Sequence, residues 1–130
     1  MGEIVYNDVS EEYADHFQAT SENMEPVIMK GNEVEIDRSF PFAEMKIGDI
    51  MVFASNPDGR KLLSRIVEVT EEKPYTLRTQ GDANPASLPG REYSITEEQY
   101  IGKVVMVYPN YDSFLSGQNG KNPYNQMIDN

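Results

Sequence analysis

The sequence predicts an all-β fold. Apolar and polar residues alternate in several short runs, turn-forming residues separate these runs every ~8–12 residues, and only one short segment has helical spacing. The chain has 130 residues, which is enough for one domain with its own hydrophobic core. We therefore expect a single antiparallel β domain, a barrel or a sandwich.

Residues 1–18 form an acidic leader. The first 25 residues contain seven carboxylates and no Lys or Arg. Ser10 can cap a helix, and Tyr13 and Phe17 have i, i+4 spacing, so we expect one short helix here. The carboxylates would then form a solvated face or, alternatively, a face that docks a partner.

The β domain is expected over residues 19–109. Its strands follow from alternating charged and β-branched residues or from short apolar runs. In the turn Asn56–Gly59, Pro57 presets φ and Gly59 tolerates a positive φ, so this turn predicts a hairpin. A capped single turn is expected at residues 94–98, and the polar tail 110–130 is expected to be loop or disordered. The expected strands cover residues 33–37, 50–53, 61–69, 75–79 and 101–108.

The composition excludes several functions. A net charge of −11 disfavours binding to nucleic acid. There is no Cys, and His16 is the only His, so thiol catalysis and His-rich metal sites are excluded. The sequence has no calcium-loop pattern and no phosphate-binding glycine loop, so we expect neither a metal nor a cofactor.

Three segments carry recognisable motifs. They are Ser21-Glu22-Asn23-Met24-Glu25-Pro26, the strand Ile47–Phe53 together with Ser64–Val69, and Thr79–Pro85 followed by Ile101-Gly102-Lys103-Val104. In order and spacing, residues 19–108 resemble the signal peptidase I family, in its archaeal and endoplasmic-reticulum-type branch. The resemblance implies a small antiparallel barrel with a β-ribbon extension.

The resemblance also implies a cleft that holds an extended peptide as an added strand. The positions that match the family's cleft are Ser21, Asn23, Met24, Pro26, Ser64 and Asp82. We interpret Asp82 mainly as a residue that holds its own turn.

The catalytic positions implied by the family are substituted. Asn23 stands where the nucleophilic Ser belongs, Ser64 where the His or Lys base belongs, and Leu88 where the supporting acid belongs. An amide is not a nucleophile in this role, and a neutral hydroxyl is not a general base. Ser21, two residues before Asn23, is only a weak substitute.

We therefore expect a non-catalytic protein that binds extended polypeptide, an assembly factor or chaperone for secreted or surface proteins. Such signal-peptidase-like proteins occur in the pilus loci of Gram-positive bacteria, where they assist pilin assembly. The resemblance implies a place at the outer face of the cell membrane, with an anchor outside this sequence. Phe40 and Phe42, on an expected loop tip, are candidates for apolar contact with the membrane.

Two alternatives remain open. One is an active signal peptidase, a serine endopeptidase with unusual catalytic residues. The other is a regulatory domain similar to self-cleaving repressors, which share the Met-x-Pro box and the Gly-Asp turn.

Overall fold

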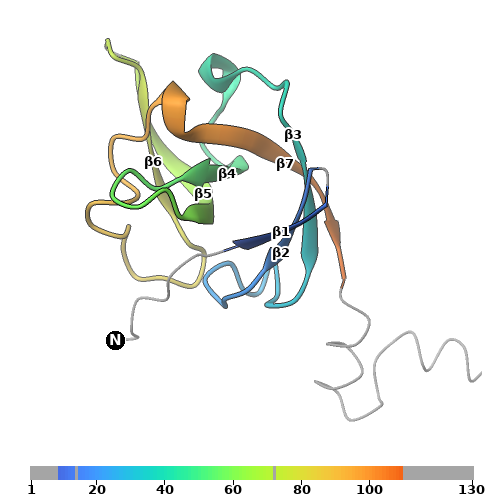
Figure 1. Cartoon of the computed structure of the whole chain (residues 1–130). Coiled ribbons are helices and arrows are strands. Elements are labelled where there is room, and N and C mark those ends of the chain that lie inside the picture. Colours follow the sequence, from blue (N-terminus) through green and yellow to red (C-terminus); the bar gives the residue numbers. More distant parts are fainter. Residues whose placement is uncertain (1–8, 14, 72, 110–130) are drawn as a thin grey trace, which may run out of the picture.

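The computed structural model describes residues 9–13, 15–71 and 73–109, with side chains from residue 15 onward. This part of the chain is all-β, as predicted, and forms one antiparallel sheet with two single-turn 3-10 helices, η1 (Phe42–Glu44) and η2 (Glu97–Gln99) (Figure 1). The strands are β1 (Val9–Tyr13), β2 (His16–Ala19), β3 (Glu33–Asp37), β4 (Ile50–Ala54), β5 (Lys61–Thr70), β6 (Thr76–Gln80) and β7 (Tyr100–Tyr108).

The strands lie in the order β1-β2-β3-β7-β4-β5-β6. Every neighbouring pair is antiparallel, and β7 fills the position between β3 and β4. Strand β1 also comes close to β5, so the sheet curls strongly. No ladder joins the two outer strands within the described residues, so the sheet is not closed.

The five strands expected from alternation or from short apolar runs are confirmed, with shifts of only one residue at some ends. The hairpin between β4 and β5 is also confirmed: Gly59 has φ +72°, and its N–H donates to the carbonyl of Ser55. The short 3-10 turn before β7 begins at Thr96, whose N–H donates to the side chain of Gln99 (3.1 Å).

The expected short helix in the acidic leader is wrong. Strands β1 and β2 pair with each other as an antiparallel hairpin, in which Tyr13 pairs with His16. Phe17 and Ala19 are buried and Gln18 is half-buried, which is the period of a strand. Pairing with β3 satisfies the backbone of β2 and buries Phe17 opposite Val34, so tertiary contacts override the local helical spacing.

The boundary placed between residues 18 and 19 therefore falls inside β2, and the described residues of the leader belong to the sheet. The tail 110–130 lies outside the described residues.

The sheet has a hydrophobic cluster on each face. In β4, Val52 points into one cluster and Met51 and Phe53 into the other, because successive side chains of a strand face opposite ways. The first cluster contains Phe17, Ala19, Met24, Ile28, Val34, Ile36, Val52 and Leu63. The second contains Phe42, Met45, Met51, Phe53, Leu62, Ile66, Leu77 and Ile95.

None of the helices in the described part of the chain has the length and apolar character needed to cross a membrane.

Candidate functional site

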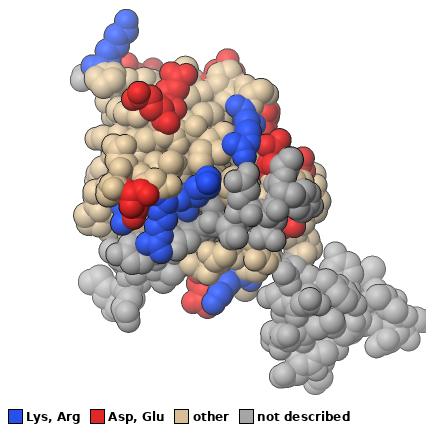
Figure 2. Space-filling model, in the orientation of Figure 1, with Lys and Arg blue, Asp and Glu red and all other residues tan. Residues whose placement is uncertain are grey.

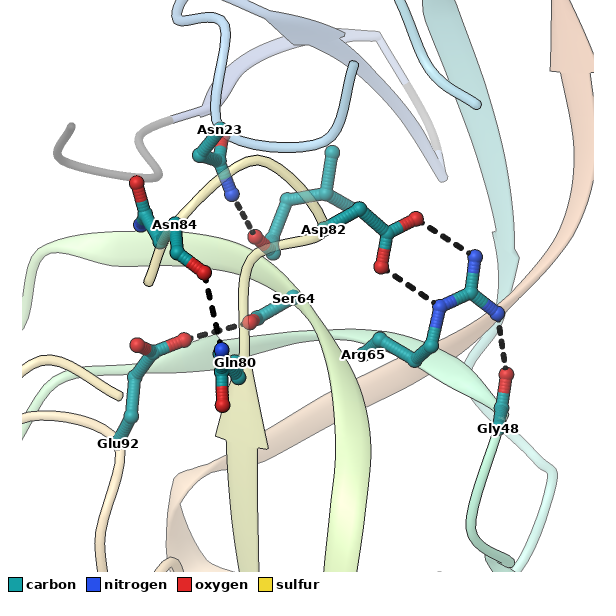
Figure 3. A network of polar contacts seen from close by, with 9 residues as sticks. Asn23, Gly48, Ser64, Arg65, Gln80, Asp82, Asn84 and Glu92 are labelled. Atoms are coloured by element: carbon teal, nitrogen blue, oxygen red, sulfur yellow. Dashed lines mark hydrogen bonds and ion pairs between the residues drawn. The ribbon is translucent and has the colours of Figure 1, made fainter. Parts of the chain in front are cut away.

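The motif segments singled out in the sequence meet at one place on the sheet. Asn23 from the Met-x-Pro box, Gly48 from the turn before β4, Arg65 from β5 and Asp82 from the loop after β6 all lie in one polar network (Figure 3). These segments are far apart in the sequence, so it is the fold that brings them together.

Asn23 is 1% exposed, and both ends of its amide are hydrogen-bonded. Its Nδ2 donates to the carbonyl of Leu63 (2.9 Å), and its Oδ1 accepts from the hydroxyl of Ser21 (2.7 Å). Its backbone carbonyl accepts from the N–H of Ala83 (2.7 Å). Asn23 thus joins the Met-x-Pro box both to β5 and to the loop after β6.

Gly81 makes this close approach possible. A Cβ at Gly81 would lie 2.9 Å from the backbone oxygen of Asn23 and 3.0 Å from its Nδ2. Any side chain at position 81 would therefore push the box away from the loop. The Gly of this motif is explained by packing and not by its backbone angles.

Ser64 is fully buried and donates a hydrogen bond to the carboxylate of Glu92 (2.5 Å). Glu92 is also fully buried, and it accepts two further hydrogen bonds, from the hydroxyl of Thr79 (3.0 Å) and from the N–H of Leu88 (2.7 Å). A buried carboxylate needs such donors, because leaving it without partners would cost several kcal/mol. We call Ser64, Thr79, Leu88 and Glu92 the buried cluster.

Sequence reasoning missed Glu92. The supporting acid was expected at position 88, but the side chain of Leu88 is apolar and buried, and only its backbone contacts the cluster. Glu92 supplies a carboxylate four residues later and accepts the hydrogen bond of Ser64, the residue at the position where a base was expected. It is the first acidic residue after position 88, which is a signal that could have found it.

Asp82 lies on the other side of β5, in a two-pronged ion pair with Arg65. The Nε and Nη2 atoms of Arg65 each lie 2.8 Å from a carboxylate oxygen of Asp82. The remaining Nη1 of Arg65 donates to the carbonyl of Gly48 (2.7 Å). The hydrogen bonds that Arg65 donates to Asp82 raise the pKa of Arg65 above its ordinary value, although partial burial opposes this. Asp82 therefore connects two loops through Arg65.

The other residues expected in the cleft differ in their exposure to solvent. Met24 is fully buried in the first hydrophobic cluster, Ser21 is half-buried, and Pro26 is exposed. The contact between Asn23 and Leu63 places the box directly against β5. A hollow of about 1050 Å³ lies elsewhere, between η1 and the end of β5, where Phe40, Ile47, Val69 and Tyr75 form part of its lining.

Phe42 is not on an exposed loop tip, which corrects that expectation. It is only 5% exposed and packs against Tyr75 and Tyr100, with ring centroids 5.4 and 5.5 Å away. Phe40 is half-buried beneath Lys103, whose Nζ lies 4.2 Å from the ring centroid. The second hydrophobic cluster draws this loop inward.

His16 forms a different group on the sheet. Its Nδ1 is hydrogen-bonded to the carboxylate of Glu33, and its ring stacks on Tyr108 at 5.8 Å. No set of three His, Cys, Asp or Glu side chains is placed to hold a metal ion in the part of the chain with described side chains.

In comparisons with known proteins, no family model and no curated protein matches this chain.

Proposed function

We propose that this protein is a non-catalytic relative of signal peptidase I that binds extended polypeptide. One observation carries the proposal: the segments that resemble the family meet in one network, while the residues at its catalytic positions serve as structural hydrogen-bonding groups. The chain keeps the family's arrangement of motifs without its chemistry.

Catalysis is disfavoured by burial as well as by residue type. Attack on a peptide bond needs a nucleophile that can reach the substrate and a base within about 2.6–3.2 Å of it. The amide of Asn23 is bonded at both ends, and the hydroxyl of Ser64 is fully buried against Glu92. The Ser21 hydroxyl donates to the amide oxygen of Asn23, which is not a base.

The arrangement of strands supports the finer description of the fold. The strong curl of the sheet, with β1 close to β5, is what a barrel of the proposed type requires. Residues 67–70 of β5 extend beyond β4 and its preceding turn and lie next to β6, which makes them a candidate for the β-ribbon extension (Figure 1).

The proposed partner is a secreted or surface polypeptide such as a pilin, which the protein would assist in assembly at the outer face of the membrane. Val27 and Met29, directly after the box, are 53% and 45% exposed. They replace Phe42 as candidates for apolar membrane contact.

The test combines binding and cleavage in one incubation. A fluorescently labelled pilin precursor segment spanning its signal-peptide region is titrated with the protein, and its anisotropy and its mass are recorded. We expect saturable binding with an unchanged mass. Absence of saturable binding, or cleavage that Ser21→Ala abolishes, would overturn the proposal.

A matched pair of variants locates the binding. Asp82 and Asp58 both pair with an Arg, at the site and in the β4–β5 hairpin respectively. Asp82→Ala is expected to weaken binding several-fold, and Asp58→Ala to leave it unchanged. Equal effects would place the peptide elsewhere on the molecule.

A further inference from the structure

Strand β7 has a free edge beyond β4. Residues 100–103 pair with β4 on one side, whereas residues 104–107 pair with β3 alone among the described strands. Figure 1 shows β7, in orange, continuing alongside β3 toward the C-terminal end of the described chain. An unpaired edge presents backbone N–H and C=O groups that can pair with another extended chain.

Strand β6, the last strand in the sheet order, has no comparable free edge. Strand β6 is covered along its outer edge, because Leu77 exchanges two backbone hydrogen bonds with Ile95 and Thr79 donates to the carbonyl of Glu92. Residues 92–95 thus shield β6, whereas no described strand shields residues 104–107 on the side that faces away from β3.

Apolar side chains surround the free edge. Val105 and Met106 are each 51% exposed and Tyr108 is 39% exposed. The ladder between β3 and β7 shifts register between Glu35 and Ile36, so residue 105 is an extra residue in β7. Val104 and Val107, by contrast, pack against the first hydrophobic cluster.

Acidic side chains lie next to this apolar strip. A hollow of about 480 Å³ is lined by Val105, by Arg38 and by the carboxylates of Asp15, Glu35 and Asp37. Arg38 pairs with Asp15 (2.6 Å), and Glu35 accepts a hydrogen bond from the hydroxyl of Tyr108 (2.7 Å), so the lining of the hollow contains three carboxylates and one guanidinium. Hydrogen bonds from Ser39 lower the pKa of Asp37 below its ordinary value, and the positive charge of Lys103 lowers it further.

We infer that the free edge at residues 104–107, with the neighbouring hollow, docks an extended polypeptide whose sequence alternates basic and apolar residues. A strand added to β7 would lie about 9–10 Å from β3, two strand spacings away, and a Lys side chain reaching across β7 spans most of this distance. Its basic residues would share the face of Glu35 and Met106, and its apolar residues would lie on the opposite face, beside Val104 and Val107.

Charge selects this occupant over a second copy of the chain. Pairing two copies through this edge would bring both sets of carboxylates together on a protein with a net charge of −11. Figure 2 shows that the Lys and Arg side chains on its visible face lie in small groups beside acidic and uncharged side chains.

This surface is distinct from the network around Asn23, so the inference goes beyond the proposed function. The test uses two fluorescein-labelled seven-residue peptides, one alternating Lys and Val and one alternating Glu and Val. We expect the wild-type protein to bind the first saturably and the second at least tenfold more weakly, with the difference shrinking in high salt.

Two charge-reversal variants form a matched pair. Glu35→Lys and Glu44→Lys change the net charge equally, but Glu44 is the last residue of η1 and does not line this hollow. Glu35→Lys is expected to weaken binding of the Lys–Val peptide about tenfold, and Glu44→Lys less than twofold. Equal losses would show diffuse charge attraction and overturn the inference. Met106→Ser keeps every charge and should weaken binding, because the methylene stems of the Lys side chains lose their apolar contact with Met106.

Amide hydrogen exchange locates the peptide directly. Binding should slow the exchange of backbone amides within residues 104–107. Protection confined to residues 21–24 and 81–84 would overturn this inference while leaving the proposed function intact. Absence of binding by the Lys–Val peptide, or self-association that Met106→Ser abolishes, would also overturn it.

Discussion

Two neighbouring residues of β5 belong to polar groups of opposite character. Ser64 points into the buried cluster with Glu92, and Arg65 points to the surface, where it pairs with Asp82. Adjacent residues of a strand face opposite sides of the sheet, so one motif supplies both groups. Water can replace a lost partner of Arg65 but not one of Ser64. The buried cluster should therefore control stability, and the surface pair should mainly position its loops.

The largest expected effect is that of Glu92→Ala. The change leaves the Ser64 and Thr79 hydroxyls and the Leu88 N–H without their acceptor in the protein interior. Each unsatisfied buried group costs about 1–3 kcal/mol, so the free energy of unfolding should fall by about 3 kcal/mol or more. Urea denaturation measures this, with the exposed Glu98→Ala as a control that stays within about 0.5 kcal/mol. A loss below about 1 kcal/mol for Glu92→Ala would show that the buried cluster contributes no more to stability than the Arg65–Asp82 pair at the surface.

Gly81→Ala should come next. The added Cβ would meet the backbone oxygen of Asn23 at 2.9 Å, and a hydrogen-bonded backbone cannot move aside freely. We expect a loss of about 1–3 kcal/mol, the usual cost of overpacking. Thermal or urea unfolding of the variant checks this. Unchanged stability would mean that the Met-x-Pro box is not held tightly against the loop after β6.

Asp82→Asn should have a smaller effect. Its ion pair with Arg65 is accessible to solvent, and pairs of this kind contribute about 0–1 kcal/mol. The loss should shrink further in 1 M salt, because added ions screen the attraction. If Asp82→Asn proved as destabilising as Glu92→Ala, the surface pair would have to be treated as part of the core.

The smallest effect concerns a second surface pair, Arg91 with Asp58. The hydrogen bond from Arg91 lowers the pKa of Asp58 below its ordinary value of 3.8. A carboxyl whose pKa is lower in the folded state stabilises that state at pH values above its pKa in the unfolded state. This contribution is lost as the pH falls through the pKa of the folded state. Arg91→Gln should raise the pKa of Asp58, as followed by an NMR titration below pH 5. An unchanged pKa would show that Arg91 does not hold this carboxylate.

Much of the sheet was predictable because burial imposes a period of two. In β3, Glu33, Glu35 and Asp37 alternate with the buried Val34 and Ile36, and the structure follows this pattern. A helix was predicted in the acidic leader because Tyr13 and Phe17 fit helical spacing. The segment forms a strand instead because it pairs with β3, and this pairing cannot be read from the local sequence. Likewise, Phe42 has the neighbours of an exposed loop tip, but Tyr75 and Tyr100, far along the chain, bury it.

The sequence motifs pointed to the residues of the candidate site, but the hydrogen-bond partners of these residues could not be predicted. The motifs singled out Asn23, Ser64 and Asp82 as cleft positions, and in Figure 3 these residues lie near one another. Their partners could not be read from the sequence, because Asn23 bonds to Leu63, 40 residues away, and Ser64 bonds to Glu92, 28 residues away. Such contacts depend on how β5, β6 and the loops between them pack.

The claim that hydroxyls at the site are structural and not reactive can be tested in a single-turnover experiment. Protein and a signal-peptide substrate are mixed in equal amounts, and both are followed by intact-mass spectrometry. We predict that the substrate keeps its mass and that no acyl adduct forms on the protein. Cleavage, or an acyl adduct located at Ser21 or Ser64, would contradict the structural role of these residues.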